Sequence, residues 1–334
     1  MTFMHKILAT TAALALTAGA ALAEPALIYD LGGKFDKSFN EAAYNGAKRW
    51  ADETGGTYRD IELQSEAQRE QALRRFAEAG ANPIITTGFA IAPVIEEVAP
   101  DYPDTKFVNI DGFIPEVPEN VAMIAFQEHQ GSYLVGMLAA MASESGTVGF
   151  IGGMDVPLIR HFGCGYAQGA KAVNPDINVV ANMTGTTPTA WNDPVKGSEL
   201  AKAQISQGAD VIYAAAGGTG VGVLQTAADE DILSIGVDSN QNHLHPGKVL
   251  TSMLKRVDVA VYKAMLAGED LETGTTQVLG LEEDGVGYAV DENNEALLTA
   301  EMTAVVEEAK QQIIDGDLEV VSYYSGDSCP VLNF

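Results

Sequence analysis

The chain has 334 residues, of which 46 are Asp or Glu and 19 are Lys or Arg, so its formal net charge at pH 7 is −27. This charge repels nucleic acids and anionic lipid surfaces, which argues against partners of either class. Hydrophobic residues make up 46% of the chain, enough for a substantial core. We therefore expect an acidic globular protein that binds no nucleic acid.

Residues 1–23 have the features of a secretory signal peptide. Two basic residues, His5 and Lys6, precede an apolar run of small residues, and Ala-Leu-Ala at 21–23 fits the small-x-small cleavage rule. The run is too short for a stable membrane span, and no cysteine lies near the cleavage point to carry a lipid. We therefore expect cleavage after Ala23 and a mature protein in the periplasm without a lipid anchor.

Short apolar segments alternate with helix-like segments, and this pattern occurs twice. In the first half we expect strands at ALIYDLGG, YRDIEL, PIITTG and KFVNID, with helices near 40–54, 67–79 and 91–99. In the second half we expect strands at TVGFIGG, INVVANM, DVIYAAAGG and LSIGVD, with helices near 164–173, 194–207 and 222–229. Continuous apolar strands separated by helices are typical of a parallel sheet covered on both faces. The chain is therefore predicted to form two doubly wound, Rossmann-like α/β lobes.

The two halves also share short sequence matches in the same order, which indicates two similar units with a cleft between them. Gly-Ala-Lys occurs at 46–48 and again at 169–171, and the strand that ends in Asp111 corresponds to the strand that ends in Asp238. Later strand and helix segments, including a helix near 297–315, are interpreted as returns to each lobe that form a hinge. The predicted lobes are residues 24–131 with 256–284, and residues 132–255 with 285–334.

Two aromatic residues stand in polar loops that are expected to face the cleft. Phe39 follows the turn after the first strand, and Trp191 lies among Thr, Asn, Asp and Pro just before a helix. An aromatic ring at the mouth of a cleft can stack on a flat ligand. The alternatives are that Phe39 packs as a staple on its own helix and that Trp191 belongs to the core.

Charged candidates lie at the ends of the predicted strands. Asp30, Asp111 and Asp238 each end a strand, where a doubly wound sheet binds its ligand, although each could instead cap a turn. Lys255 and Arg256 follow a later strand. In an acidic chain, a cation at such a crossover between lobes is expected to pair with a carboxylate.

A glycine-rich turn, AAAGGTGVG from Ala214, has the order of a dinucleotide-binding loop, with Asp238 as its acidic partner. A secreted protein meets no pool of nicotinamide cofactor, so we expect the turn to bring backbone amides close to another ligand. The histidines at 129, 161, 243 and 245 lack the helical spacing of metal ligands, and the sequence has no Ser-His-Asp or paired-carboxylate motif. We therefore predict a binding protein that is not an enzyme and uses neither metal nor cofactor.

Cys164 and Cys329 are the only cysteines. In an oxidising compartment they can pair, which would pin the C-terminal tail to the second lobe. Two buried, unpaired thiols are the alternative. A catalytic cysteine is not expected, because nothing nearby forms a base and an orienting group.

Several motifs spread along the chain resemble those of one known family. They are Asp36-Lys37-Ser38-Phe39-Asn40, GSYLVG from Gly131, GFIGGMDVP from Gly149, AAAGGTG from Ala214, IGVDSNQ from Ile235 and LTSMLKR from Leu250. Together they resemble the basic membrane protein (BMP) family of ABC-transporter solute-binding proteins, and within it the purine-nucleoside receptor (PnrA-like) group. The resemblance implies a type I periplasmic-binding fold, a purine nucleoside or nucleobase as ligand, an inner-membrane ABC permease as partner, and a monomer.

The resemblance also implies roles for matching residues at the base of the ligand. Two aromatic side chains of the family sandwich the purine, and they correspond to Phe39 and Trp191. The base-contacting aspartate at the end of the first strand corresponds to Asp30. Asn40 is also expected to line the site.

Other matching residues are implied to hold the sugar. The ribose-binding aspartate and lysine of the family correspond to Asp238 and Lys255. Gly217 and Gly218 are expected to bring backbone amides near the ligand.

Phe35 and His129 depart from the family pattern, which often has an acid at the first position and a small amide at the second. We count His129 and Asp111 among the predicted ligand-binding residues, because both lie where the lobes are expected to meet.

Two other functions stay open at this point. One is a receptor for a sugar or another small polar solute in the same fold, because aromatic rings also stack on sugars. The other is a secreted nucleoside-processing enzyme.

Overall fold

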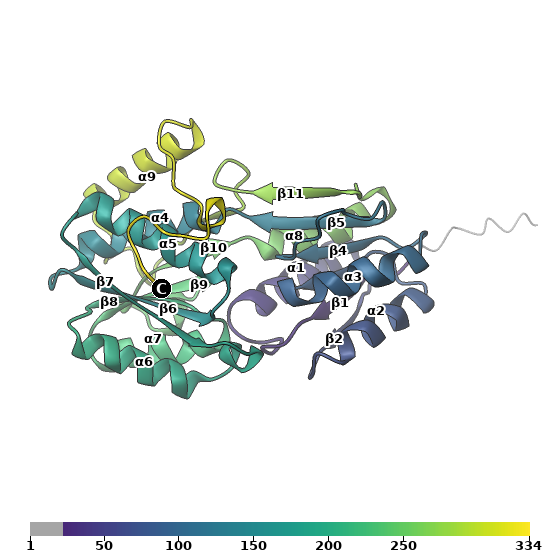
Figure 1. Ribbon diagram of the computed structural model, residues 1–334, viewed down its shortest axis with the longest axis horizontal. Coiled ribbons are helices and arrows are strands. Elements are labelled where there is room, and N and C mark those ends of the chain that lie inside the picture. The colour runs from purple at the N-terminus through teal and green to yellow at the C-terminus, as the bar shows by residue number, and fades with distance from the viewer. Residues whose placement is uncertain (1–22) are drawn as a thin grey trace, which may run out of the picture.

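The computed structural model describes residues 23–334, so the predicted signal peptide lies outside the described residues except for Ala23. Two α/β lobes stand side by side, and each is built on a six-stranded sheet (Figure 1). The predicted fold class, two doubly wound lobes joined by a hinge, is therefore confirmed.

The first sheet has the strand order β11-β5-β4-β3-β1-β2, and all its strands run parallel. Its strands are β1 (Ala26–Tyr29), β2 (Arg59–Glu62), β3 (Ile84–Thr87), β4 (Phe107–Ile110), β5 (Val121–Phe126) and β11 (Thr275–Leu279). Every residue of β1, β3 and β4 is buried, as expected for central strands covered by helices on both faces.

The second sheet has the corresponding order β12-β10-β9-β8-β6-β7, and only β12 runs antiparallel to its neighbour. Its strands are β6 (Thr147–Met154), β7 (Asn178–Gly185), β8 (Val211–Ala215), β9 (Leu233–Asp238), β10 (Val249–Lys255) and β12 (Val286–Tyr288). In each sheet the first strand lies between the second and the third, so the winding direction reverses at β1 and at β6. Doubly wound sheets bind ligands beyond the carboxyl ends of strands at such a reversal.

All but the last of the α-helices lie between strands in chain order, as the sequence pattern predicts. They are α1 (Phe39–Thr54), α2 (Gln68–Glu78), α3 (Ala92–Val98), α4 (Glu128–Ala142), α5 (Pro157–Val173), α6 (Pro194–Ser206), α7 (Gly218–Asp229), α8 (Val257–Ala267) and α9 (Ala300–Ile314). Helix α5 begins earlier than the predicted start at 164, because Pro157 opens it. Proline is favourable there, since the first turn of a helix has no use for its missing N–H.

The hinge consists of three crossings between the lobes. Strand β5 of the first sheet leads into α4, which packs on α5, and β10 of the second sheet leads into α8, which packs on α1. Strand β11 then joins the first sheet and β12 joins the second. Three crossings bring the ends of β4, β5 and β10 close together beside the hinge.

Helices α4 and α5 approach each other unusually closely, because glycines face the contact. A Cβ atom added to Gly136 would lie 2.1 Å from the carbonyl oxygen of Tyr166, and one added to Gly165 would lie 2.2 Å from the carbonyl oxygen of His129. Only glycine allows backbones to meet at such a distance. The close approach fixes which side chains of the two helices touch.

Candidate functional site

A cavity of about 400 Å³ lies between the lobes, beyond the carboxyl ends of strands in both sheets. Eight of the ten predicted ligand-binding residues line it. The first lobe contributes Asp30, Phe39, Asn40 and Asp111, and the second contributes Trp191, Gly217, Asp238 and Lys255. The structure therefore gathers residues from sites spread over more than half of the sequence.

His129 and Gly218 do not line this cavity. Gly218 is the first residue of α7 and lies behind Trp191, whose carbonyl oxygen would be 3.2 Å from a Cβ at that position. His129 stacks on His161 instead, with ring centroids 4.2 Å apart, because the glycine contact holds α4 against α5. Burial and the neighbouring His161 together lower the pKa of His129 to about 3, although Glu128 opposes the shift, so the ring is uncharged at neutral pH.

The two predicted aromatic residues enter the cavity from opposite lobes. Phe39 is the first residue of α1, and Trp191 ends a short 3-10 helix, Pro188–Trp191. The Trp191 ring rests on Gly153, where an added Cβ would lie 2.1 Å from the ring, and the Trp191 Cβ is 3.3 Å from the Cβ position of Gly32. Trp191 is therefore held by the backbone of both lobes, which gives it a fixed orientation.

Lys255 is the centre of a buried charged cluster at one end of the cavity. Its ammonium is bonded to the Asp111 carboxylate and lies 2.8 Å from Oε1 of Glu128, and its side chain is 1% exposed. Phe39 and Phe162 each place a ring 5.3 Å from Nζ, close enough for a cation–π contact. The expected pairing of a crossover lysine with carboxylates is thus present.

The cluster contains more acidic than basic side chains, and this imbalance shifts the pKa values of its members. Burial lowers the pKa of Lys255, but Asp111, Glu128 and Asp238 raise it more, so the net direction is upward and the lysine stays charged. Burial raises the pKa of Asp111 to about 7, although Lys255 opposes the shift, and burial likewise raises the pKa of Asp238. Asp111 and Asp238 also adopt left-handed backbone conformations, with φ of 73° and 63°. Strain of this kind gathers at functional sites.

Asp30 faces Arg69, a residue that the sequence analysis missed. Nε and Nη2 of Arg69 donate to the two carboxylate oxygens of Asp30 at 3.1 Å each, and both residues line the cavity. Arg69 belongs to α2 and lies in a run of polar and charged residues, a pattern that predicts a solvent-exposed helix face. Its partner lies 39 positions earlier in the sequence, and no local spacing could have revealed the pair.

Asn40 positions other groups of the site. Its amide donates to the carbonyl oxygens of Asp30 and Gly33 at 3.2 and 3.1 Å, and its Oδ1 accepts from the Thr87 hydroxyl at 2.8 Å. Most of its hydrogen-bonding capacity is therefore used to shape the loop that presents Asp30.

Asp36 is a second residue that was not predicted to bind, although it too lines the cavity. Its carboxylate accepts from the backbone N–H groups of Ser38, Asn40 and Glu41 at 2.8, 3.0 and 3.1 Å, so it holds the start of α1. Burial raises the pKa of Asp36 to about 7 despite these bonds.

The loop that carries Asp36 also joins the lobes. The Ser38 hydroxyl donates to Asp238, the Ser239 hydroxyl donates to the Ser38 carbonyl at 2.8 Å, and the Gln241 amide donates to the Lys37 carbonyl at 3.0 Å. The two lobes are therefore closed over the cavity at this edge.

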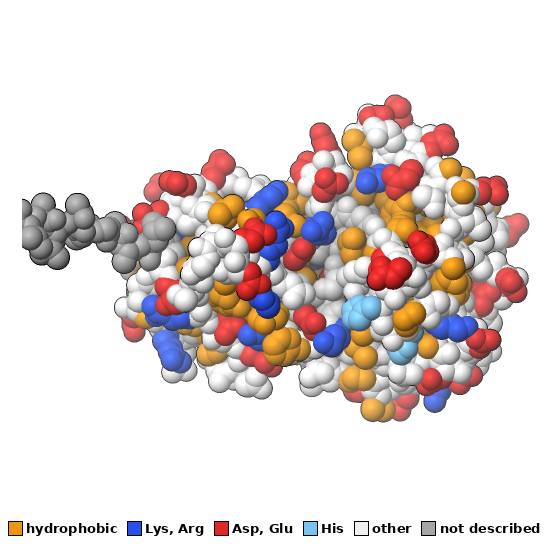
Figure 2. All heavy atoms as spheres, turned by 180° about the vertical axis from the view of Figure 1, so that it is seen from behind, with side chains coloured by type: hydrophobic (Ala, Val, Ile, Leu, Met, Phe, Trp, Pro, Cys, Tyr) orange, Lys and Arg blue, Asp and Glu red, His pale blue; other side chains and the backbone are white. Residues whose placement is uncertain are grey.

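Charge is spread over the outside as the composition implies. Figure 2 shows acidic side chains on both lobes of the face turned toward the viewer.

Within residues 23–334, no cluster of three His, Cys, Asp or Glu side chains is arranged to hold a metal ion. No helix in the same part of the chain is long and apolar enough to cross a membrane.

Comparison with known proteins identifies the family. A family model described as ABC transporter substrate-binding protein PnrA-like (Bmp) matches residues 26–320. The chain belongs to this family. The resemblance inferred from the motifs is therefore confirmed, and membership implies a small-molecule ligand and a membrane permease as partner.

Individual relatives agree with this assignment. The CD4+ T-cell-stimulating antigen of Listeria monocytogenes is 34% identical over 320 residues, which cover 88% of this chain and 87% of that protein. The ABC transporter nucleoside-binding protein BmpA of Lactococcus lactis is 31% identical over 323 residues, which cover 89% and 88% of the two chains. A solute-binding protein of an ABC transporter system from Aeropyrum pernix has a crystal structure that covers 91% of this chain and 95% of its own, with a TM-score of 0.83 and 30% identity.

The predicted localisation is corrected by these relatives. A relative from Pyrococcus furiosus, 34% identical over 79% of this chain, is named a lipoprotein, as are two further Pyrococcus relatives, and a Borreliella burgdorferi relative is named basic membrane protein D. These names point to lipid-anchored, membrane-associated proteins and contradict a periplasmic protein without a lipid anchor. The prediction was wrong: it rested on the absence of a cysteine near residue 23, and the names of these relatives overturn it.

Proposed function

We propose that the protein captures a purine nucleoside or nucleobase between its lobes and delivers it to the permease of an ABC importer. The observation that carries this proposal is the pair of aromatic side chains, Phe39 and Trp191, that line one cavity from opposite lobes. A purine is flat, and stacking of a base on an aromatic side chain is worth about 1–3 kcal/mol. In the closed arrangement of the lobes, both rings would lie against the base.

The charged end of the cavity suits the hydroxyl groups of a ribose. Oδ1 of Asp111 is buried and has no hydrogen-bonding partner among residues 23–334. A ligand hydroxyl that donates to this oxygen would remove the cost of its desolvation. Lys255 can donate to a ribose oxygen, and Asp238 can accept from a second hydroxyl.

The Asp30–Arg69 pair suits the edge of a base. Arg69 uses Nε and Nη2 for Asp30, and its Nη1 makes no hydrogen bond within the described part of the chain, since the Glu66 carboxylate is 3.8 Å away. The carboxylate oxygens of Asp30 therefore keep lone pairs that can accept, next to N–H groups of Arg69 that can donate. A purine edge carries a donor next to an acceptor, and such an edge matches this arrangement.

Two further observations support delivery to a permease. The relative BmpA is named a nucleoside-binding protein, and other relatives are named lipoproteins, which fits capture of a ligand close to a membrane. The lobes meet through Ser38 and Asp238, so a residue proposed to hold the ribose also takes part in closure. A ligand held there would couple its own binding to the closed shape that a permease recognises.

We also propose that the lobes comprise residues 24–131 with 256–284 and residues 132–255 with 285–334. The support for these bounds is that β11 pairs with β5, whereas β12 pairs with β10 and α9 packs on α4.

The test is calorimetric titration of protein that has been unfolded and refolded to remove any retained ligand. Adenosine, guanosine, inosine and their free bases are compared with ribose and galactose as controls. We expect tight binding of at least one purine and none of the sugars. Tight binding of a sugar without binding of any purine would instead identify a sugar receptor.

The same protein is then incubated with inosine, with and without phosphate. A binding protein returns inosine unchanged. Release of free base above background would contradict the proposal and identify a nucleoside-processing enzyme.

A further inference from the structure

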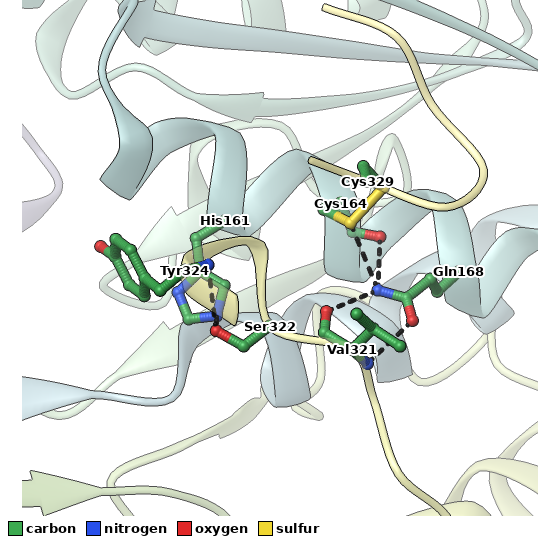
Figure 3. The surroundings of a disulfide bond; sticks show 7 residues. All are labelled: His161, Cys164, Gln168, Val321, Ser322, Tyr324 and Cys329. Atoms are coloured by element: carbon green, nitrogen blue, oxygen red, sulfur yellow. Dashed lines mark hydrogen bonds between the residues drawn. A yellow bond between two sulfur atoms is a disulfide. The ribbon is translucent and has the colours of Figure 1, made fainter. Parts of the chain in front are cut away.

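The C-terminal tail that follows α9 is fastened onto α5 (Figure 3). Cys329 of the tail forms a disulfide with Cys164 of α5. The side chain of Gln168 donates to the carbonyl of Val321 and accepts from its N–H, both at 2.9 Å, as a neighbouring strand would. The disulfide and this two-way hydrogen-bonded contact thus both hold the tail against α5, and Nη1 of Arg160 adds a further bond by donating to the Tyr323 hydroxyl at 3.0 Å.

One residue of α5, His161, lies between this tail and the hinge. Its Nε2 is 3.2 Å from the Ser322 hydroxyl, and the Tyr324 ring covers it at a centroid distance of 4.5 Å (Figure 3). Its Nδ1 is 3.4 Å from Oε2 of Glu128. Both atoms are buried and neither makes a hydrogen bond among residues 23–334, so this 3.4 Å polar contact is the compensation that each of them has.

The contacts continue from Glu128 to the ligand cavity. Oε1 of Glu128 is 2.8 Å from Nζ of Lys255, and the Lys255 ammonium is bonded to Asp111 at the cavity wall. Both Glu128 and Lys255 have side chains that are 1% exposed. A single line of polar contacts, Ser322–His161–Glu128–Lys255, therefore runs from the tail to the cavity.

We propose that the disulfide-fastened tail positions Lys255 for ligand binding, with His161 and Glu128 as the positioning residues. The proposal rests on the proposed function in one respect, namely that Lys255 contacts the ligand. A buried carboxylate needs compensation at both oxygens. While the tail holds His161 in place, one oxygen of Glu128 is compensated by the imidazole and the other faces Lys255.

Loss of the His161 imidazole is expected to move the Lys255 ammonium, because it changes the partners of Glu128. Without His161, the Glu128 carboxylate has only Lys255 as a partner, and both of its oxygens compete for the ammonium. The ammonium then shifts away from Asp111, and the donor that it presents to the cavity is displaced.

The first experiment needs no ligand. Protein labelled with ¹⁵N-lysine is studied by ¹H–¹⁵N NMR, because a buried ammonium exchanges its protons slowly, and the Lys255 signal is assigned by its loss in Lys255→Met. We expect His161→Ala to shift or broaden this signal and His161→Gln, which keeps one donor and one acceptor, to restore it. The matched control is Tyr166→Phe, which removes a buried hydroxyl without a hydrogen-bonding partner from the same helix.

The second experiment measures affinity for the purine nucleoside that binds the wild type. We expect His161→Ala to weaken binding by about tenfold, Ser322→Ala by less, and Tyr166→Phe to have no effect. Circular dichroism checks that each variant is folded.

The outcomes separate this inference from the proposed function. An unchanged Lys255 signal in a folded His161→Ala protein overturns the positioning role, whatever the ligand proves to be. A shifted signal together with unchanged nucleoside affinity also overturns it, because the displaced lysine would then not matter for binding. Failure of the wild type to bind any purine refutes the proposed function, while the NMR result still decides whether His161 positions the lysine.

Discussion

Replacing Lys255 with methionine should destabilise the protein far more than the same change at an exposed lysine. Lys255 is 1% exposed, is bonded to Asp111 and lies 2.8 Å from Glu128. Removal of one partner from a buried ion pair costs about 3–5 kcal/mol, and methionine keeps most of the side-chain volume, so the loss reports the charge. Lys248→Met is the matched control, because Lys248 pairs with Asp231 at the surface, where such pairs are worth about 0–1 kcal/mol.

The free energy of unfolding is measured by urea denaturation with circular dichroism, at about pH 7.5 and about pH 5.5. The deficit of Lys255→Met should shrink at the lower pH. Without the lysine, the buried carboxyl groups have raised pKa values in the folded state, so the folded protein takes up protons that the unfolded chain does not. A deficit below about 1 kcal/mol, equal to that of Lys248→Met, would refute the view that this cluster depends on one buried cation.

Four further predictions follow from the site and the tail. Trp191→Ala should weaken purine binding by about tenfold or more, and unchanged affinity would make Trp191 a structural residue. Asp238→Asn should weaken nucleosides more than free bases in calorimetry, and equal losses would contradict a ribose contact. Because Asp36 and Asp111 have pKa values of about 7 when folded, the unfolding free energy should rise by about 1 kcal/mol as the pH falls from about 8 to about 6.5. His129 opposes part of this gain, because its pKa is lowered in the folded state and the unfolded chain takes up its proton first. A stability that stays flat or falls over this range, measured by urea denaturation, would contradict the burial of the two carboxyl groups. Reduction of the disulfide should lower the unfolding free energy by about 2–4 kcal/mol, and a loss confined to measurement error would show that the tail is held without it.

The sequence predicts most of the framework, because apolar periodicity and turn chemistry are local properties. Alternation of apolar strands and helices predicts both sheets, and strand ends predict Asp30, Asp111 and Asp238 as residues of the cleft. The start of α5 is the main difference in the helices. The predicted segment began at 164, whereas the proline at 157 opens the helix and brings Phe162 to the cavity.

The sequence could not predict contacts that depend on how helices pack. Arg69 lies in a polar helical segment, and only the folded sheet brings it to Asp30. His129 was predicted to bind ligand because it lies at a crossover, but the glycine contact between α4 and α5 turns it toward His161. Glu128, its neighbour in the sequence, is the residue that reaches the charged cluster.

The most direct test of the central claim is to denature the purified protein and identify the small molecule it releases by mass spectrometry. A cavity closed between two lobes is expected to retain its ligand through purification. We expect a purine nucleoside or a free purine base. A monosaccharide released in place of a purine would contradict it.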